Sequence, residues 1–158
     1  MVRLKLTVSL LALALFAALG TAPAQGAADR ADFVRKVDPI CKREQVKAVG
    51  LLKRAKPRNR SRATAYARIA GSGRAAIAEI YRIGPPPQSY ELVLFDRWIQ
   101  KLQLENALTE QAADALRSGQ TGRAAKRLRD AADADRRAAH IVRSFGFRYC
   151  DAPALGSP

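Results

Sequence analysis

Apolar residues recur along most of the chain at intervals of three and four, the spacing that gathers them on one face of an α-helix. Four segments carry this pattern, at about 29–55, 61–83, 89–118 and 121–145, with short polar, Gly- or Pro-containing breaks between them. No stretch of comparable length alternates apolar and polar residues as a strand does. The pattern predicts an all-α fold, most simply an up-down-up-down four-helix bundle.

The core faces are predicted from the same spacing. Asn106 falls within the apolar stripe of the third segment, so we expect a single buried polar residue that fixes helix pairing. Gly71 and Gly73 interrupt the second segment and are interpreted as a point of close approach between helices. The predicted apolar positions are Phe33, Val37, Ile40, Cys41, Ala48, Leu51, Leu52 and Ala55; Tyr66, Ile69, Ala76, Ile77 and Ile80; Leu92, Phe95, Trp98, Ile99, Leu102, Leu108, Ala113 and Leu116; and Ala124, Leu128, Ala131, Ala132, Ala138, Val142 and Phe145.

Capping residues and breakers mark the ends of these segments. Asp38-Pro39 in the first segment indicates either a kink or a new helix start with Pro at its first position. The second alternative places Cys41 in the first turn of the main helix. The expected caps are Asp29 or Asp32, Ser61 and Ser89, and the expected stops are Gly84 with Pro85–Pro87, Gly119 and Gly146.

The first 24 residues have the three parts of a secretory signal peptide. Arg3 and Lys5 precede a charge-free apolar run of about 14 residues, shorter than the roughly 20 needed to span a bilayer. Ala22-Pro23-Ala24 then predicts cleavage before Gln25, with other positions up to Ala28 also possible. We therefore expect an exported protein with a single helical domain over 25–158 that ends in a short flexible tail.

Two cysteines, Cys41 and Cys150, lie in the predicted exported part. An even pair in an oxidising compartment favours one structural disulfide over free thiols. The up-down-up-down topology brings the start of the first helix and the end of the last to one end of the bundle, so it supports the same pairing. Leu, Ile, Val and Phe are scarce enough that a cross-link and close Ala-lined packing have to supplement the core.

Most site chemistry is excluded by composition. The one histidine, His140, is expected to be a half-buried structural residue, with Ser144 one turn away and no carboxylate to orient its ring. The sequence has no CxxCH and no Glu-x-x-His, the patterns of haem attachment and di-iron bundles. Glu105, Glu110 and Asp114 are interpreted as a solvated face, with loose binding of a cation as the alternative. Asp130, Asp133 and Asp135 alternate with Arg residues and are interpreted as a salt-bridged exterior. We expect neither an enzyme nor a cofactor.

The net charge of +14 is unevenly distributed. Six basic residues without an acidic neighbour fall in the predicted loop between the first two helices, at the end of the bundle opposite the disulfide. Such a run can bind a polyanion, whereas the lack of aromatic residues within it gives no support for stacking on nucleic-acid bases. A solvated loop that reflects the general abundance of Arg and Ala remains the alternative. The residues are Lys53, Arg54, Lys56, Arg58, Arg60 and Arg62.

Three short motifs suggest a family. Residues 32–41 (DFVRKVDPIC), Pro85–Pro87 and residues 145–150 (FGFRYC) together resemble a group of small exported helical proteins from high-GC Gram-positive bacteria. The resemblance implies an extracytoplasmic four-helix domain with paired cysteines and no assigned activity. Many members appear with a lipid-attachment Cys after the signal, which this chain lacks, and Pro39 also departs from the group.

These observations lead to one functional hypothesis and one alternative. We expect a secreted, non-enzymatic bundle that binds an anionic envelope polymer or a partner protein through the basic loop, with peripheral contact to an anionic membrane also compatible. The alternative is a small-ligand carrier with an apolar cavity between the helices near Trp98 and Tyr66. The sequence does not determine the oligomeric state.

Overall fold

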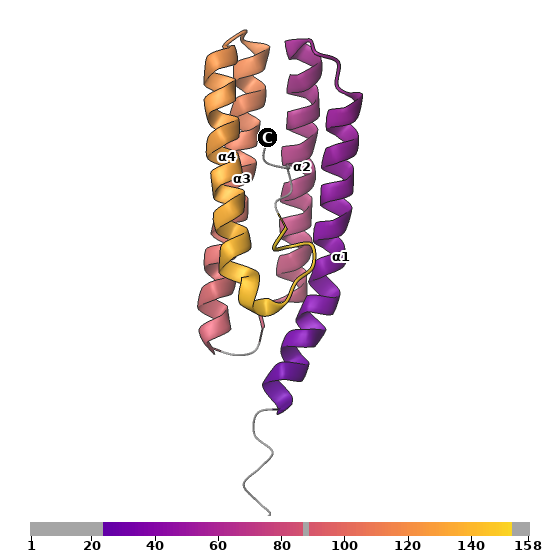
Figure 1. Cartoon of the computed structure of the whole chain (residues 1–158), viewed down its shortest axis with the longest axis vertical. Coiled ribbons are helices and arrows are strands. Elements are labelled where there is room, and N and C mark those ends of the chain that lie inside the picture. Colours follow the sequence, from indigo (N-terminus) through magenta and orange to yellow (C-terminus); the bar gives the residue numbers. More distant parts are fainter. Residues whose placement is uncertain (1–23, 87–88, 153–158) are drawn as a thin grey trace, which may run out of the picture.

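The computed structural model describes residues 24–86 and 89–152 as four long helices and a short C-terminal segment. The helices are α1 (Ala24–Arg54), α2 (Asn59–Ile83), α3 (Ser89–Arg117) and α4 (Thr121–Val142). Successive helices run antiparallel, and each packs on the next in chain order (Figure 1). The prediction of an all-α, up-down-up-down four-helix bundle is confirmed. The predicted signal peptide, apart from Ala24, and the end of the predicted C-terminal tail lie outside the described residues.

A strap, residues 146–152, folds back from the end of α4 across α1 (Figure 1). It follows the 3₁₀ turn η1 (Arg143–Phe145) and begins at Gly146, whose φ of 83° requires the conformational freedom of glycine. Cys150 in the strap is bonded to Cys41 of α1, with an Sγ–Sγ distance of 2.10 Å. The predicted disulfide therefore closes the bundle.

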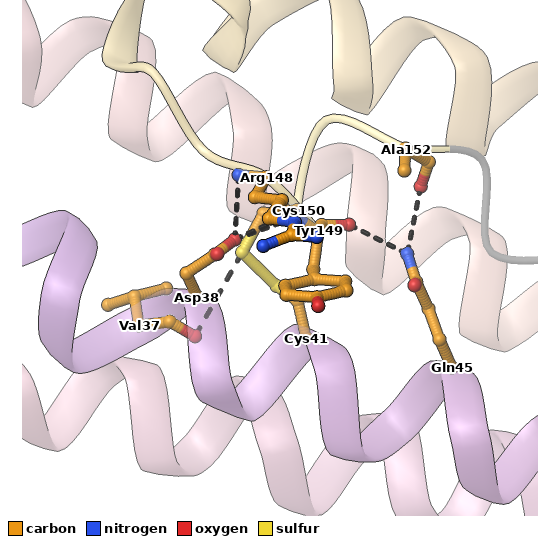
Figure 2. Close-up of a disulfide and its surroundings, with 8 residues drawn as sticks. All are labelled: Val37, Asp38, Cys41, Gln45, Arg148, Tyr149, Cys150 and Ala152. Atoms are coloured by element: carbon orange, nitrogen blue, oxygen red, sulfur yellow. Dashed lines mark hydrogen bonds between the residues drawn. A yellow bond between two sulfur atoms is a disulfide. The ribbon is translucent and has the colours of Figure 1, made fainter.

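Hydrogen bonds hold the strap on both sides of the disulfide (Figure 2). Gln45 Nε2 donates to the carbonyl oxygens of Tyr149 and Ala152, at 2.7 and 3.1 Å. Asp38 Oδ1 accepts the backbone N–H groups of Arg148, Tyr149 and Cys150, at 3.1, 2.7 and 3.2 Å. The side chain of Asp38 thus provides the hydrogen-bond acceptor for three backbone N–H groups of the strap.

The core divides into two parts along the bundle. Five aromatic side chains, one from α1, two from α3 and two from the C-terminal segment, pack with ring centroids between 5.7 and 6.2 Å apart: Phe33, Phe95, Trp98, Phe145 and Phe147. Towards the other end the core is mostly alanine, including Ala48, Ala63, Ala113 and Ala124, with Leu116. Small side chains allow the helices to approach closely there, as the composition predicts.

Some predicted boundaries and positions are wrong. α1 begins at Ala24, upstream of Asp29 and Asp32, so neither residue caps it, and Cys41 lies in the middle of this helix. The upstream turns are held by Arg30, whose guanidinium lies 2.5 Å from the carboxylate of the buried Glu91 on α3. Leu92, predicted to face the core, is 38% exposed.

Pro39 and Ser61 each bear on a predicted helix start. α1 continues through Pro39, so of the two alternatives the new helix start is wrong, and the kink stays a prediction. The carboxylate of Asp38 accepts strap amides and does not cap a helix. α2 begins at Asn59, and the Ser61 hydroxyl accepts the backbone N–H of Lys56, which holds the preceding loop. The predicted stops at Gly84, Gly119 and Gly146 are confirmed by their positive φ angles.

Asn106 and Gly73 form a close contact between α3 and α2. Asn106 is 8% exposed, and its Nδ2 donates to the carbonyl oxygen of Leu102 one turn earlier. A Cβ built at Gly73 would lie 2.8 Å from Cγ of Asn106, closer than side chains tolerate. The predicted buried polar residue and the predicted point of close approach are therefore one contact.

A matched pair of substitutions tests this contact. We expect Gly73→Ala to destabilise the protein by about 1–3 kcal/mol, because the added methyl group must displace Asn106. A Cβ at Gly71 would meet nothing within 4 Å, so Gly71→Ala should stabilise by about 0.5–1 kcal/mol. Denaturant unfolding of both variants measures the difference. Equal effects at the two positions would contradict the contact.

Candidate functional site

The six basic residues predicted to bind a polyanion all lie on the surface at the α1–α2 end of the bundle. Lys53 and Arg54 end α1, Lys56 and Arg58 lie in the connecting loop, and Arg60 and Arg62 lie at the start of α2. All six side chains are exposed. Among the described residues, none of the six forms a salt bridge or a side-chain hydrogen bond.

The turn between α3 and α4 lies at the same end of the bundle (Figure 1). The N-termini of α2 and α4 therefore both point their positive dipole ends to this surface. Neither helix has an acidic residue in its first turn or a side-chain cap on its first amides. A cleft of about 640 Å³ lies between the start of α2 and the end of α3, lined by Asn59, Arg60, Thr64, Leu116, Arg117 and Gly119.

Elsewhere in the described chain about half of the basic residues form salt bridges. On α4, Asp130 lies 2.8 Å from Lys126, and Asp133 lies 2.8 Å from Arg137, in each case four residues apart. Between helices, Arg74 lies 2.8 Å from Glu110. Residues 53–62 differ in being a run of six exposed basic residues of which none is paired. We call the surface formed by residues 53–62 and the α3–α4 turn the basic end.

A second feature is a half-open cavity of about 100 Å³. It lies between the helices and under the strap, and the Cys41–Cys150 disulfide forms part of its wall. Ile69, Ile77 and Ile80 of α2 and Trp98 of α3 give it apolar walls. Trp98 lines the cavity as the carrier hypothesis expects, but Tyr66 does not, and three carboxyl groups are also present: Glu44, Glu105 and Asp135.

Two of these carboxyl groups correct the interpretation of the acidic faces. Asp135 is 9% exposed, and Glu105 is part-buried on α3 and lines the cavity. Burial, aided by the negative charge of Asp135, raises the pKa of the Glu105 carboxyl to about 8. Helical spacing already contained the signal, since Glu105 follows Leu102 by three residues and Asp135 lies between Ala131 and Ala138.

The remaining candidates do not form a catalytic arrangement. His140 is exposed on α4, not half-buried as predicted, and Ser144 is exposed as well. Over residues 24–86 and 89–152 no group of three or more His, Cys, Asp or Glu side chains is placed to hold a metal ion. None of the helices in the described part of the chain is long and apolar enough to cross a membrane.

Comparisons with protein-family models, with curated proteins and with solved structures found no match to this chain.

Proposed function

We propose that this protein is an exported, non-enzymatic bundle that binds an anionic polymer of the cell envelope through its basic end. The observation that carries the proposal is the state of the six basic side chains of 53–62. They are exposed and have no acidic partner, whereas four of the six basic residues of α4 are paired along the helix: Lys126, Arg127, Arg136 and Arg137. The signal-peptide pattern of residues 1–24 supports export.

Electrostatics favours an anion at this surface. Basic side chains at the start of a helix oppose its dipole, and the effect is uncompensated at both α2 and α4 because neither has a cap or an acidic first turn. A bound phosphate or carboxylate would relieve this repulsion and accept hydrogen bonds from Arg, whose planar guanidinium suits both anions. The 640 Å³ cleft beside Arg60 and Arg117 gives a polymer chain a place to lie.

The composition of the basic end favours a soluble polymer over a bilayer. None of the exposed large apolar residues in the described chain lies within 53–62 or in the α3–α4 turn. A surface without apolar or aromatic anchors binds mainly by charge, so its affinity falls steeply with salt.

The test compares two variants that lose the same charge. In the first, the six basic residues of 53–62 are changed to Ser. In the control, six exposed basic residues elsewhere are changed to Ser: Lys42, Lys47, Arg82, Arg97, Arg143 and Arg148. Binding to a polyphosphodiester and to purified cell walls is measured between about 50 and 200 mM salt.

We expect the affinity of wild type and control to fall steeply as the salt concentration rises. The first variant should lose most of its affinity at low salt, and its remaining affinity should depend less on the salt concentration. Equal losses in the two variants would mean that net charge acts without a local site, and would contradict the proposal. Stronger retention on anionic vesicles than on the polymer would also contradict it, in favour of a membrane surface.

A further inference from the structure

Two open clefts flank the first turns of α2 at the basic end. The larger, about 640 Å³, lies between α2 and α3, and the smaller, about 230 Å³, lies between the end of α1 and α2. Thr64 on α2 lines both, so the two clefts adjoin. Among the described residues, neither lining includes an acidic or an aromatic side chain. The start of α2 is thus crossed by a path that contains no carboxyl group.

Each cleft has one arginine on either wall. Arg60 of α2 and Arg117 of α3 line the larger cleft, and Arg54 of α1 and Arg68 of α2 line the smaller one. All four side chains are exposed. In the part of the chain that the structure describes, only Arg117 of these four has an acidic partner, Asp114, in an exposed pair of the kind that contributes little to stability. Each cleft therefore offers an anion guanidinium groups from two different helices.

A neutral hydrogen-bond donor accompanies the arginines in each cleft. The Ser61 hydroxyl in the smaller cleft accepts the backbone N–H of Lys56, at 2.9 Å, so its own proton is free to be donated. The side-chain amide of Asn59 in the larger cleft has no hydrogen-bond partner among the described residues. The Thr64 hydroxyl, by contrast, already donates to the carbonyl oxygen of Arg60. Each cleft thus combines two arginines with one neutral donor.

This arrangement suits a phosphate better than a carboxylate. The two oxygens of a carboxylate lie in one plane, and a single arginine takes both in a bidentate pair. A phosphodiester holds its two charged oxygens on a tetrahedral phosphorus, so arginines on opposite walls can each reach one. Arg60 and Arg68 are eight residues apart on α2, about 12 Å along the helix axis, so one phosphate cannot occupy both clefts. Two phosphates of one chain can.

We propose that the anionic polymer at the basic end is a polyphosphodiester that crosses the start of α2 with one phosphate in each cleft. Arg60 and Arg117 bind one phosphate, Arg54 and Arg68 bind the other, and the chain between them passes over Thr64. The second phosphate binds at the high effective concentration set by the first, so affinity rises once the chain spans both clefts. This assignment rests on the proposed function and adds the chemistry and the path of the polymer.

The probes are base-free oligomers of increasing length, in which phosphodiester groups are joined by three-carbon spacers. Oligoglutamates of equal charge and single-stranded DNA of equal length are the comparisons, all at about 50 mM salt. We expect affinity for the base-free oligomers to rise about tenfold or more at the length that spans both clefts, and to exceed that for oligoglutamate by a similar factor. DNA should bind no more tightly, because no aromatic side chain of the described residues lines either cleft.

The comparisons separate this assignment from the proposed function. Equal affinity for oligoglutamate, lost in the variant without the six basic residues of 53–62, would overturn the phosphate assignment and leave polyanion binding at the basic end intact. Tighter binding of DNA than of the base-free oligomer would overturn the assignment in favour of a nucleic acid.

Two arginines outside 53–62 test the path. Arg68→Gln with Arg117→Gln should lower affinity for the spanning oligomer about tenfold or more and remove the rise with length. The control, Arg123→Gln with Arg129→Gln, removes the same charge from exposed side chains of α4 and should lower affinity no more than about twofold. Equal losses in the two variants would overturn the path.

Thr64→Trp places a bulky side chain where the clefts meet. Thr64 is exposed, so the fold should tolerate the change. We expect the rise of affinity with length to disappear while the shortest oligomer binds as it does to wild type. If the rise persists, or if all the cleft variants bind like wild type while the variant without the six basic residues of 53–62 does not bind, the path is wrong and the proposed function stands.

Discussion

Replacement of both cysteines, Cys41→Ala with Cys150→Ala, is expected to remove about 4–5 kcal/mol from the free energy of unfolding. The disulfide joins residues 109 apart in sequence, and the chain-entropy model assigns a loop of that size this stabilisation. Small domains have about 5–15 kcal/mol in total, so the variant should unfold about 10–20 °C lower. Denaturant and thermal unfolding of the oxidised protein and the variant measure the loss.

The strap should change before the helices do. Phe147 in the strap stacks on Trp98, with ring centroids 5.7 Å apart, and Phe145 packs on Phe33. Loosening of the strap therefore uncovers the aromatic core, and near-ultraviolet circular dichroism should be lost at lower denaturant than the helical signal. Coincident loss of the two signals would contradict a separately held strap.

Asp38 offers a comparison within the same contact. Asp38→Ala removes the acceptor of three strap amides but keeps the covalent tether, so we expect a smaller loss of about 2 kcal/mol. If the oxidised and the reduced wild-type protein unfold at the same temperature, the disulfide does not stabilise the native state and the first prediction is wrong.

The helical spacing of the apolar residues predicted the fold because apolar residues at this spacing share the face of the helix that is buried. The stripes of Phe33, Ile40, Ile80 and Ile99 were identified by spacing alone, and all four side chains are buried. The spacing also placed Asn106 and Gly73 in the core, but no pattern within one helix shows which residue of another helix it meets. Only the structure shows that Asn106 meets Gly73.

Two parts of the molecule lie outside what periodicity can detect. The strap has no repeating apolar pattern, and only Cys150 indicated that it returns to α1; the hydrogen bonds from Asp38 and Gln45 depend on geometry between distant segments. The first turns of α1, at 24–31, contain no large apolar residue. They are helical because alanine favours helix and Arg30 reaches Glu91.

The interior carboxyl groups were missed for a different reason. Charged side chains are rarely buried, and most acidic residues of this chain fit positions on the surface. Glu105 and Asp135 were therefore also interpreted as surface residues. The position of Glu105 relative to Leu102 was nevertheless correct evidence for burial. Charge and spacing disagreed at this residue, and such disagreement is typical of functional positions.

The raised pKa of Glu105 makes a contribution to the free energy of unfolding that decreases as the pH rises. Its pKa is about 8 in the folded protein against an ordinary value of 4.5, first because of burial and second because of the Asp135 charge. The folded state therefore binds the Glu105 proton more tightly than the unfolded state. This contribution is fully present below about pH 4.5 and is lost as the pH rises through 8, at up to about 1.4 kcal/mol per pH unit.

Glu105→Gln keeps the size of the side chain and cannot ionise, so its stability relative to wild type should grow with pH. We expect a gain of up to about 4 kcal/mol between pH 5 and pH 8.5, reduced by the partial exposure of Glu105. Denaturant unfolding at half-unit pH steps measures the difference between the two proteins, in which the titration of all other groups cancels.

Two further variants separate the causes of the shift. Glu110→Gln, an exposed residue that pairs with Arg74, should leave the pH dependence of wild type unchanged. Asp135→Asn removes the neighbouring charge but not the burial, so the pH at which stability is lost should move down while part of the effect remains. If the difference in stability between wild type and Glu105→Gln stays constant from pH 5 to 8.5, Glu105 titrates as it does in water. Its carboxyl group would then face solvent and not the cavity wall.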